Sequence, residues 1–159
     1  MPTPYATGVQ RAAEPWYRAL DRKQWYTLCA ANLGWVFDGY ETYALILTVA
    51  PVFRQLLAGD QLAAIPFYAG LTIAVTLLGW GIGGIVGGIL SDYIGRKRML
   101  IYAILAYSLT TGLTALAWSW TSFIALRFIV GLALGSEWGT GAAMVAEMWP
   151  SKHRARAAG

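Results

Sequence analysis

Charge is scarce in this chain of 159 residues. Asp, Glu, Lys and Arg make up 13% of it and hydrophobic residues 57%, whereas an ordinary soluble domain carries about 25% charge. Residues 61–91 and 99–126 contain no charged residue at all. Each of these runs exceeds the roughly 18 apolar residues that a helix needs to cross a bilayer. The composition therefore excludes a disordered chain and a typical cytosolic enzyme, and it predicts a polytopic membrane protein.

Cysteine and histidine are almost missing. Cys29 has no partner for an intramolecular disulfide, which excludes a disulfide-stapled secreted module. His153 is the single histidine and lies in a basic segment, so we expect a solvated loop residue and not a metal ligand. The chain also lacks a Ser/His/Asp set and a phosphate-binding loop. We therefore expect no enzyme activity and no cofactor.

Four segments are apolar enough to be membrane spans. They must be helices, because an open strand edge in lipid would leave backbone groups without hydrogen bonds. Glycines repeat at every fourth position in the second (79, 83, 87) and fourth spans (131, 135, 139), which favours close packing against another helix. The expected spans are residues 25–50, 67–90, 99–117 and 122–144.

The Lys and Arg residues predict the orientation of these spans. Ten of the twelve fall in residues 1–24, 91–98 and 147–159, which the spans place on one side. Arg54 alone falls on the opposite side, and Arg127 lies within a span. Excess Lys and Arg marks cytoplasmic loops, so we expect a multi-pass protein of the cell (inner) membrane with a cytoplasmic N-terminus. The same dispersal among apolar spans argues for membrane lipid and against nucleic acid as a partner.

Four charged residues lie inside the predicted spans, where each costs about 2.5 to 3.5 kcal/mol on an insertion scale. Asp38 and Glu41 share one face of the first span, and mutual repulsion favours protonation of one of them. Arg127 stays cationic, so competition between Arg127 and a proton for one carboxylate would make a switch. The alternative is a permanent structural ion pair. Two roles are equally consistent with the position of Glu137: a second proton-binding site, or a structural contact in a gate.

Three motifs resemble those of the major facilitator superfamily. Residues 88–97, GILSDYIGRK, are similar to its loop G-x-x-x-D-R/K-x-G-R-R/K, with Tyr93 in place of a basic residue. Residues 127–135, RFIVGLALG, resemble its R-x-x-x-G-x-x-x-G helix. Residues 147–154, EMWPSKHR, resemble its E-x-x-P-x-x-x-R connector. The motifs occur in the family's order and spacing.

Two further elements resemble proton-coupled carboxylate transporters within that superfamily. They are Asp38-Gly39-Tyr40-Glu41 and Gly135-Ser136-Glu137-Trp138-Gly139, in which Ser136 replaces a glycine. The nearest groups are sialate and monocarboxylate:proton symporters, followed by aromatic-acid:proton symporters. The resemblance implies twelve helices in two halves, alternating access, and symport of a small organic anion with a proton.

The resemblance also implies residue roles. It makes Glu41 and Arg127 the protonation pair and Asp38 a further essential acid, and Glu137 belongs to the matching element of the fourth span. It assigns a cytoplasmic charge network to the loop and the connector. The implied gating residues are Gly88, Asp92, Gly95, Arg96, Lys97, Glu147 and Arg154.

The chain stops at residue 159 after Ala157-Ala158-Gly159, which reads as the start of another helix. We therefore expect an all-α membrane protein comprising the first four helices of a twelve-helix major facilitator fold. Residues 25–159 would form a partial N-terminal domain that needs the missing C-terminal helices as its partner. The main alternative is a complete four-helix exporter of drugs, proton-coupled and homodimeric. A structural membrane scaffold is a third interpretation, but it leaves the four intramembrane charges unexplained.

Overall fold

The computed structural model of the protein describes residues 21–148, and within this range it is helical with no strand. Most of the predicted N-terminal segment and of the connector, including Arg154, lies outside the described residues. Four long helices and one short 3-10 helix follow one another along the chain. They are α1 (Arg22–Leu56), η2 (Gly59–Ala64), α2 (Ile65–Ile94), α3 (Arg96–Thr114) and α4 (Trp120–Met148).

Each long helix overlaps one expected span, with differences at the ends. The third span was expected to reach residue 117, but α3 ends at Thr114 and α4 begins earlier than expected, at Trp120. Ser119 explains that start, because its hydroxyl accepts the Ser122 N–H at 3.1 Å and caps the helix. By length and hydropathy, two segments, 59–94 and 120–147, are long and apolar enough to cross a membrane.

Local chemistry fixes two further helix ends. Asp21 caps α1, since its carboxylate accepts the Arg22 N–H at 2.7 Å while Gln24 accepts the Asp21 N–H at 2.9 Å. Gly95 separates α2 from α3 with φ at 90°, the only positive φ within residues 21–148. A side chain would be strained there. The glycine of the predicted loop thus makes an abrupt turn between two helices.

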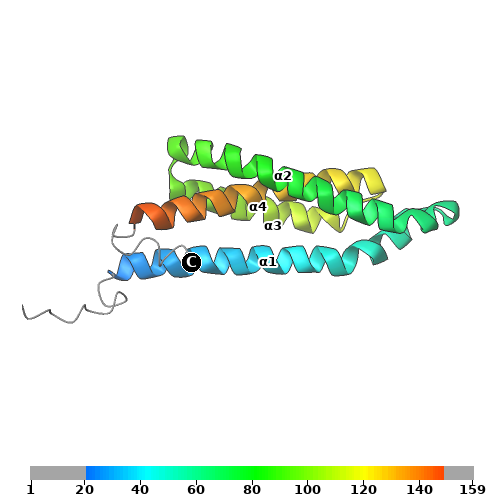
Figure 1. Ribbon diagram of the computed structural model, residues 1–159, viewed down its shortest axis with the longest axis horizontal. Coiled ribbons are helices and arrows are strands. Elements are labelled where there is room, and N and C mark those ends of the chain that lie inside the picture. Colours follow the sequence, from blue (N-terminus) through cyan, green and yellow to red (C-terminus); the bar gives the residue numbers. More distant parts are fainter. Residues whose placement is uncertain (1–20, 149–159) are drawn as a thin grey trace, which may run out of the picture.

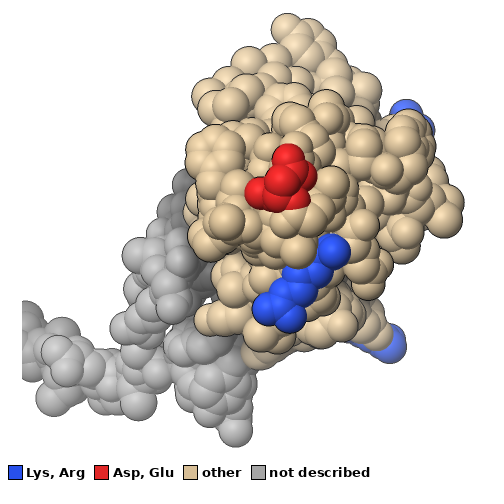
Figure 2. Space-filling view, turned by 90° about the vertical axis from the view of Figure 1, so that its right-hand side faces the viewer, with Lys and Arg blue, Asp and Glu red and all other residues tan. Residues whose placement is uncertain are grey.

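The four helices lie side by side as a bundle (Figure 1). The start of α1, the α2–α3 junction and the end of α4 lie at the same end of the bundle (Figure 1). This end, called the basic end below, carries Arg22, Lys23, Arg96, Lys97 and Arg98. The opposite end, formed by η2 and the α3–α4 connection, shows few charged side chains on a mostly uncharged surface (Figure 2). The helices therefore place the basic segments together, as the predicted orientation requires.

The glycine stripes of α2 and α4 face each other, so the two backbones approach closely. A methyl group added at Gly79 would lie 2.5 Å from the carbonyl oxygen of Phe128, and one at Gly83 or Gly135 would collide with the facing backbone. Ser136, which replaces the glycine of the family element, donates a hydrogen bond across the contact to the Gly83 carbonyl at 3.0 Å. The pair α2–α4 is the most tightly packed part of the bundle.

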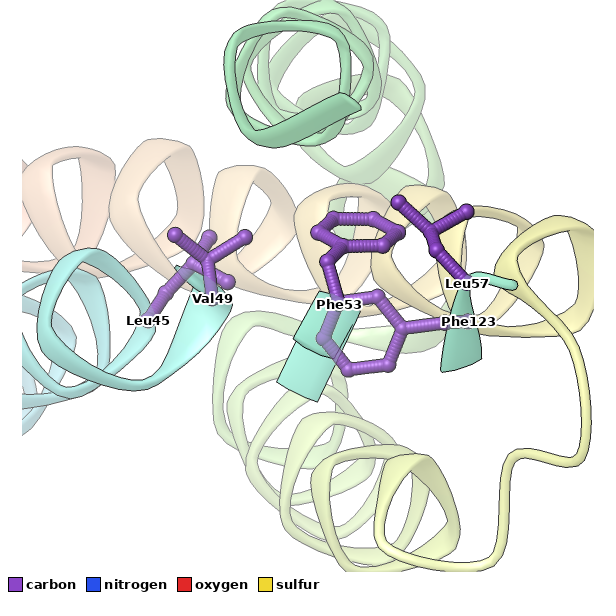
Figure 3. Packing of buried hydrophobic residues seen from close by; sticks show 5 residues of the cluster. All are labelled: Leu45, Val49, Phe53, Leu57 and Phe123. Atoms are coloured by element: carbon purple, nitrogen blue, oxygen red, sulfur yellow. The ribbon is translucent and has the colours of Figure 1, made fainter. Parts of the chain in front are cut away.

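A cluster of apolar side chains closes the bundle toward the η2 end. It joins the last turns of α1 to the start of α4, with Phe53 at its centre (Figure 3). The ring of Phe53 meets that of Phe123 edge to face, at 5.7 Å between centroids. The cluster begins at Leu45, one turn beyond Glu41, and therefore shields the interior charges from that end. Its buried members are Leu45, Val49, Phe53, Leu57 and Phe123.

Candidate functional site

Glu41 on α1 and Arg127 on α4 form an ion pair inside the bundle. Arg127 Nη1 lies 2.5 Å from Glu41 Oε1, and the two side chains are 7% and 12% exposed. Thr111 on α3 donates a hydrogen bond to the same carboxylate oxygen at 3.1 Å. The structure thus brings together two of the predicted residues and adds a neutral donor from a third helix.

Space is available on both sides of this ion pair. A cavity of about 50 Å³ lies beside Glu41 and Arg127, which is room for a few water molecules. A larger one of about 560 Å³ between α1 and α3 is lined by Glu41, Tyr40 and Tyr107. Nε of Arg127 is buried and makes no hydrogen bond to the described residues. The guanidinium therefore retains a donor for a further acceptor.

Asp38 lies in a separate, aromatic cavity of about 290 Å³ between α1, α2 and α4. Trp35, Trp80 and Trp138 line it, and the Trp138 centroid is 6.1 Å from that of Trp35 and 6.0 Å from that of Trp80. Both Asp38 carboxylate oxygens are buried without a hydrogen-bond partner among the described residues. Asp38 lies on the same helix as Glu41 but forms no ion pair or hydrogen bond with Arg127 within residues 21–148.

Glu137 is 1% exposed and lies where α4 meets the half of α1 that is nearer the basic end. Its carboxylate rests against the backbone of Gly34, where any side chain on α1 would collide with Oε1. Neither oxygen of Glu137 has a hydrogen-bond partner among residues 21–148. Gly34 precedes Asp38 by about one helical turn, so Glu137 contacts α1 one turn away from Asp38.

At the basic end, Arg96 connects three segments. Its guanidinium pairs with Asp92 at the end of α2, at 2.5 Å, and with Glu147 on α4, at 2.8 Å. It also donates to Ser91 and to the carbonyl oxygen of Gly88. The hydrogen bond that Arg96 donates to the Glu147 carboxylate raises the pKa of the guanidinium above its ordinary value. The structure thus joins the predicted gating residues Gly88, Asp92, Arg96 and Glu147, whereas Lys97 is exposed and takes no part in these contacts.

Sequence reasoning missed Thr111, Ser91 and the three tryptophans of the aromatic cavity. A threonine or serine in an apolar helix carries no signal of its own, because it usually bonds to its own helix backbone. The tryptophans lie on three different helices, so no local spacing relates them. Within residues 21–148, no group of three His, Cys, Asp or Glu is arranged to hold a metal ion.

If the gating role that the resemblance to the major facilitator superfamily implies is correct, removing Arg96 should slow turnover without weakening substrate binding. Exposed ion pairs contribute at most about 1 kcal/mol each, but Arg96 makes two, so Arg96→Gln should shift a conformational equilibrium by about tenfold. Asp92→Asn should have a smaller effect, since Glu147 remains. The measurement is KM and kcat for uptake by the full-length protein in vesicles. The matched control is Arg98→Gln, an exposed neighbour on α3, and a raised KM at normal kcat would place Arg96 in the binding site instead.

Charged side chains buried between long apolar helices are rare in membrane proteins, where they face a cavity or pair with a partner. The family model of the Major Facilitator Superfamily matches residues 31–159. The chain belongs to this family, whose members are helical integral membrane proteins.

Curated relatives agree with this assignment. A putative metabolite transport protein of Haemophilus influenzae is 36% identical over 84% of the chain and 31% of that protein. A probable 4-methylmuconolactone transporter of Cupriavidus pinatubonensis is 33% identical over 91% of the chain and 32% of that protein. The sialic acid transporter NanX of Escherichia coli is 31% identical over 91% of the chain and 34% of that protein.

The chain spans about a third of the length of the curated relatives it matches. These relatives are named as transporters and not as enzymes. No solved structure gives a significant match to the chain.

Proposed function

We propose that the protein is a secondary active transporter that carries a small organic acid together with a proton by alternating access. The observation that carries the proposal is the buried Glu41–Arg127 ion pair. A cation paired with a single carboxylate can exchange that partner for a proton and a substrate anion together. Protonation of Glu41 releases Arg127, and the free guanidinium then binds the carboxylate of the substrate, for which its fork of donors is suited.

Several contacts support this exchange. The unpartnered Nε of Arg127 offers a second donor to an incoming carboxylate. Cavities border the pair, whereas the Phe53 cluster closes the η2 end. Thr111 can stay on Glu41 in either protonation state, because its hydroxyl both donates and accepts. Asp38 and Glu137 are the remaining acids of the site.

The names of the relatives indicate the size and chemistry of the cargo. Two of them are named for sialic acid and for 4-methylmuconolactone. In this chain, the cavity around Asp38 has three tryptophans and about 290 Å³, a suitable volume for one ring-sized molecule. In the proposed orientation the basic end is cytoplasmic, in the cell (inner) membrane, and the rest of the transporter supplies the opposing wall of the cavity.

The test is proton-driven uptake by the full-length protein in liposomes. With the outside acidified and the membrane potential held at zero, we expect sialic acid, 4-methylmuconolactone, benzoate or lactate to accumulate above its outside concentration. Proton symport at one proton per anion allows about tenfold accumulation per pH unit, because a pH unit is worth about 1.4 kcal/mol. A protonophore should abolish the accumulation. Saturable uptake that ignores the pH gradient would contradict the proton coupling.

A further inference from the structure

Two buried carboxyl groups lie near the contact between α1 and α4, Asp38 on α1 and Glu137 on α4. Glu137 is 1% exposed, and its oxygens, like both oxygens of Asp38, are buried without a hydrogen-bond partner among the described residues. The carboxylate of Glu137 lies on the backbone of Gly34, one helical turn before Asp38. Asp38 itself lines a cavity together with Leu134 and Trp138, which flank Glu137 on α4. They are therefore neighbours on opposite helices.

No cation among residues 21–148 is placed to neutralise these two acids. Arg127 lies ten residues before Glu137, which is about 15 Å along α4, and it is already bound to Glu41. From α3 the nearby titratable group is Tyr107, which lines a cavity together with Gly34 and carries no charge at physiological pH. From α2 the cavity is lined by Thr76, Leu77 and Trp80, none of which carries charge.

Two ionised carboxylates in this environment would be very unfavourable. Each buried, unpaired charge has lost its hydration without compensation, and two like charges close together add repulsion. One proton between them removes both penalties, because the protonated acid donates a short, charge-assisted hydrogen bond to the remaining carboxylate. The same proton gives partners to oxygens that otherwise have none.

We propose that Asp38 and Glu137 form a second proton-binding site, in which one shared proton joins α1 to α4. Glu137, the more buried of the two, carries the proton and donates it to Asp38. The site is separate from the Glu41–Arg127 pair and needs no substrate, so the inference does not depend on the proposed function. Loss of the proton leaves two like charges at the contact, which pushes α1 away from α4.

The helix contact around this site is built from small and aromatic residues. Trp35 stacks near Trp138, and a methyl group added at Gly141 would lie 3.9 Å from the Cβ of Ala31. That separation falls in the Cβ–Cβ range of a disulfide. Disulfide formation by the Ala31→Cys, Gly141→Cys pair therefore measures whether α1 and α4 are in contact beside the acids.

The first test is infrared difference spectroscopy of the full-length protein in liposomes at neutral pH, in H₂O and D₂O. Asp38→Asn and Glu137→Gln should each remove one protonated-carboxyl C=O band, because the amide replaces the protonated acid as donor and leaves the other acid ionised. The double variant should remove no more of this band than either single variant. Glu137→Asp should keep the band, and Asp60→Asn, in an exposed turn, should leave it unchanged. An unchanged protonated band in both single variants would overturn the proposal.

The second test measures the contact itself. In a Cys29→Ala background, the Ala31→Cys, Gly141→Cys pair should form a disulfide readily at neutral pH and severalfold less once alkaline pH removes the shared proton. Glu137→Gln should abolish that decrease, since a single charge remains at most. The thiols titrate equally in both backgrounds, so their own pH dependence cancels in the comparison. Identical pH profiles with and without Glu137→Gln would refute the proton-dependent contact.

Discussion

Glu41→Gln is expected to abolish uphill, proton-driven uptake by the full-length protein while sparing exchange. The glutamine side chain has the shape of a protonated glutamate and cannot ionise, so Arg127 stays free for the substrate anion at every pH. Binding then no longer depends on a proton. The accumulation ratio at zero membrane potential should fall from about tenfold per pH unit to about one. Counterflow of labelled against unlabelled acid should persist, because it requires no net proton release.

The measurement compares accumulation and counterflow in the same liposomes. Asp60→Asn is the matched control, since it removes an exposed acid from the turn between α1 and α2 and should retain the wild-type ratio. Glu41→Asp keeps a titratable group, although one carbon further from Arg127, and should recover part of the accumulation. If the glutamine variant still concentrates the acid, Glu41 does not carry the proton, and Asp38 or Glu137 becomes the candidate.

The sequence predicted the fold because the apolar runs and the three motifs are local signals. Charge-free stretches indicated helices where α2, α3 and α4 lie. The spacing of Gly83 and Gly135 indicated close packing, but the fact that the two stripes face each other depends on the order of the helices in space. The end of α3 was not predictable from the apolar run either, because that run continues into α4. The two helices are separated where the Ser119 hydroxyl caps α4 by accepting the Ser122 N–H.

The four charged members of the candidate site and the pairing of Glu41 with Arg127 were predictable, whereas the contacts of Asp38 and Glu137 were not. Charge inside an apolar span is a strong signal, and it selected Asp38, Glu41, Arg127 and Glu137. Charge alone could not decide which acid Arg127 binds, because that choice depends on the relative height of α1 and α4, and only the family resemblance indicated Glu41. In the structure Arg127 pairs with Glu41, and Glu137 packs against the backbone of Gly34. No local sequence pattern marks Gly34 as the residue that contacts α4.

A side chain added at Gly135 is expected to force α2 and α4 apart and to destabilise the helix bundle strongly. At Gly135 even one added methyl group would collide with the carbonyl oxygen of Trp80, and its next neighbour would be the Gly84 N–H nitrogen at 2.7 Å. Both are backbone atoms, so no rotamer change relieves the collision and the helices must separate. Gly135→Ala should therefore cost about 3 kcal/mol, the upper part of the range for overpacking. That cost corresponds to more than about a hundredfold loss in the equilibrium between packed and separated helices.

Gly112 on α3 provides the matched control, because a methyl group added there meets nothing within 4 Å. Gly112→Ala should be neutral or stabilising by up to about 1 kcal/mol, since alanine is the better helix former. Thermal unfolding of the full-length protein in detergent measures both variants. Gly135→Leu should go further and leave little monodisperse protein to extract from the membrane. Equal unfolding temperatures for Gly135→Ala and Gly112→Ala would show that α2 and α4 do not pack through Gly135, and the geometry of the ion pair that α4 presents to α1 would then need a different support.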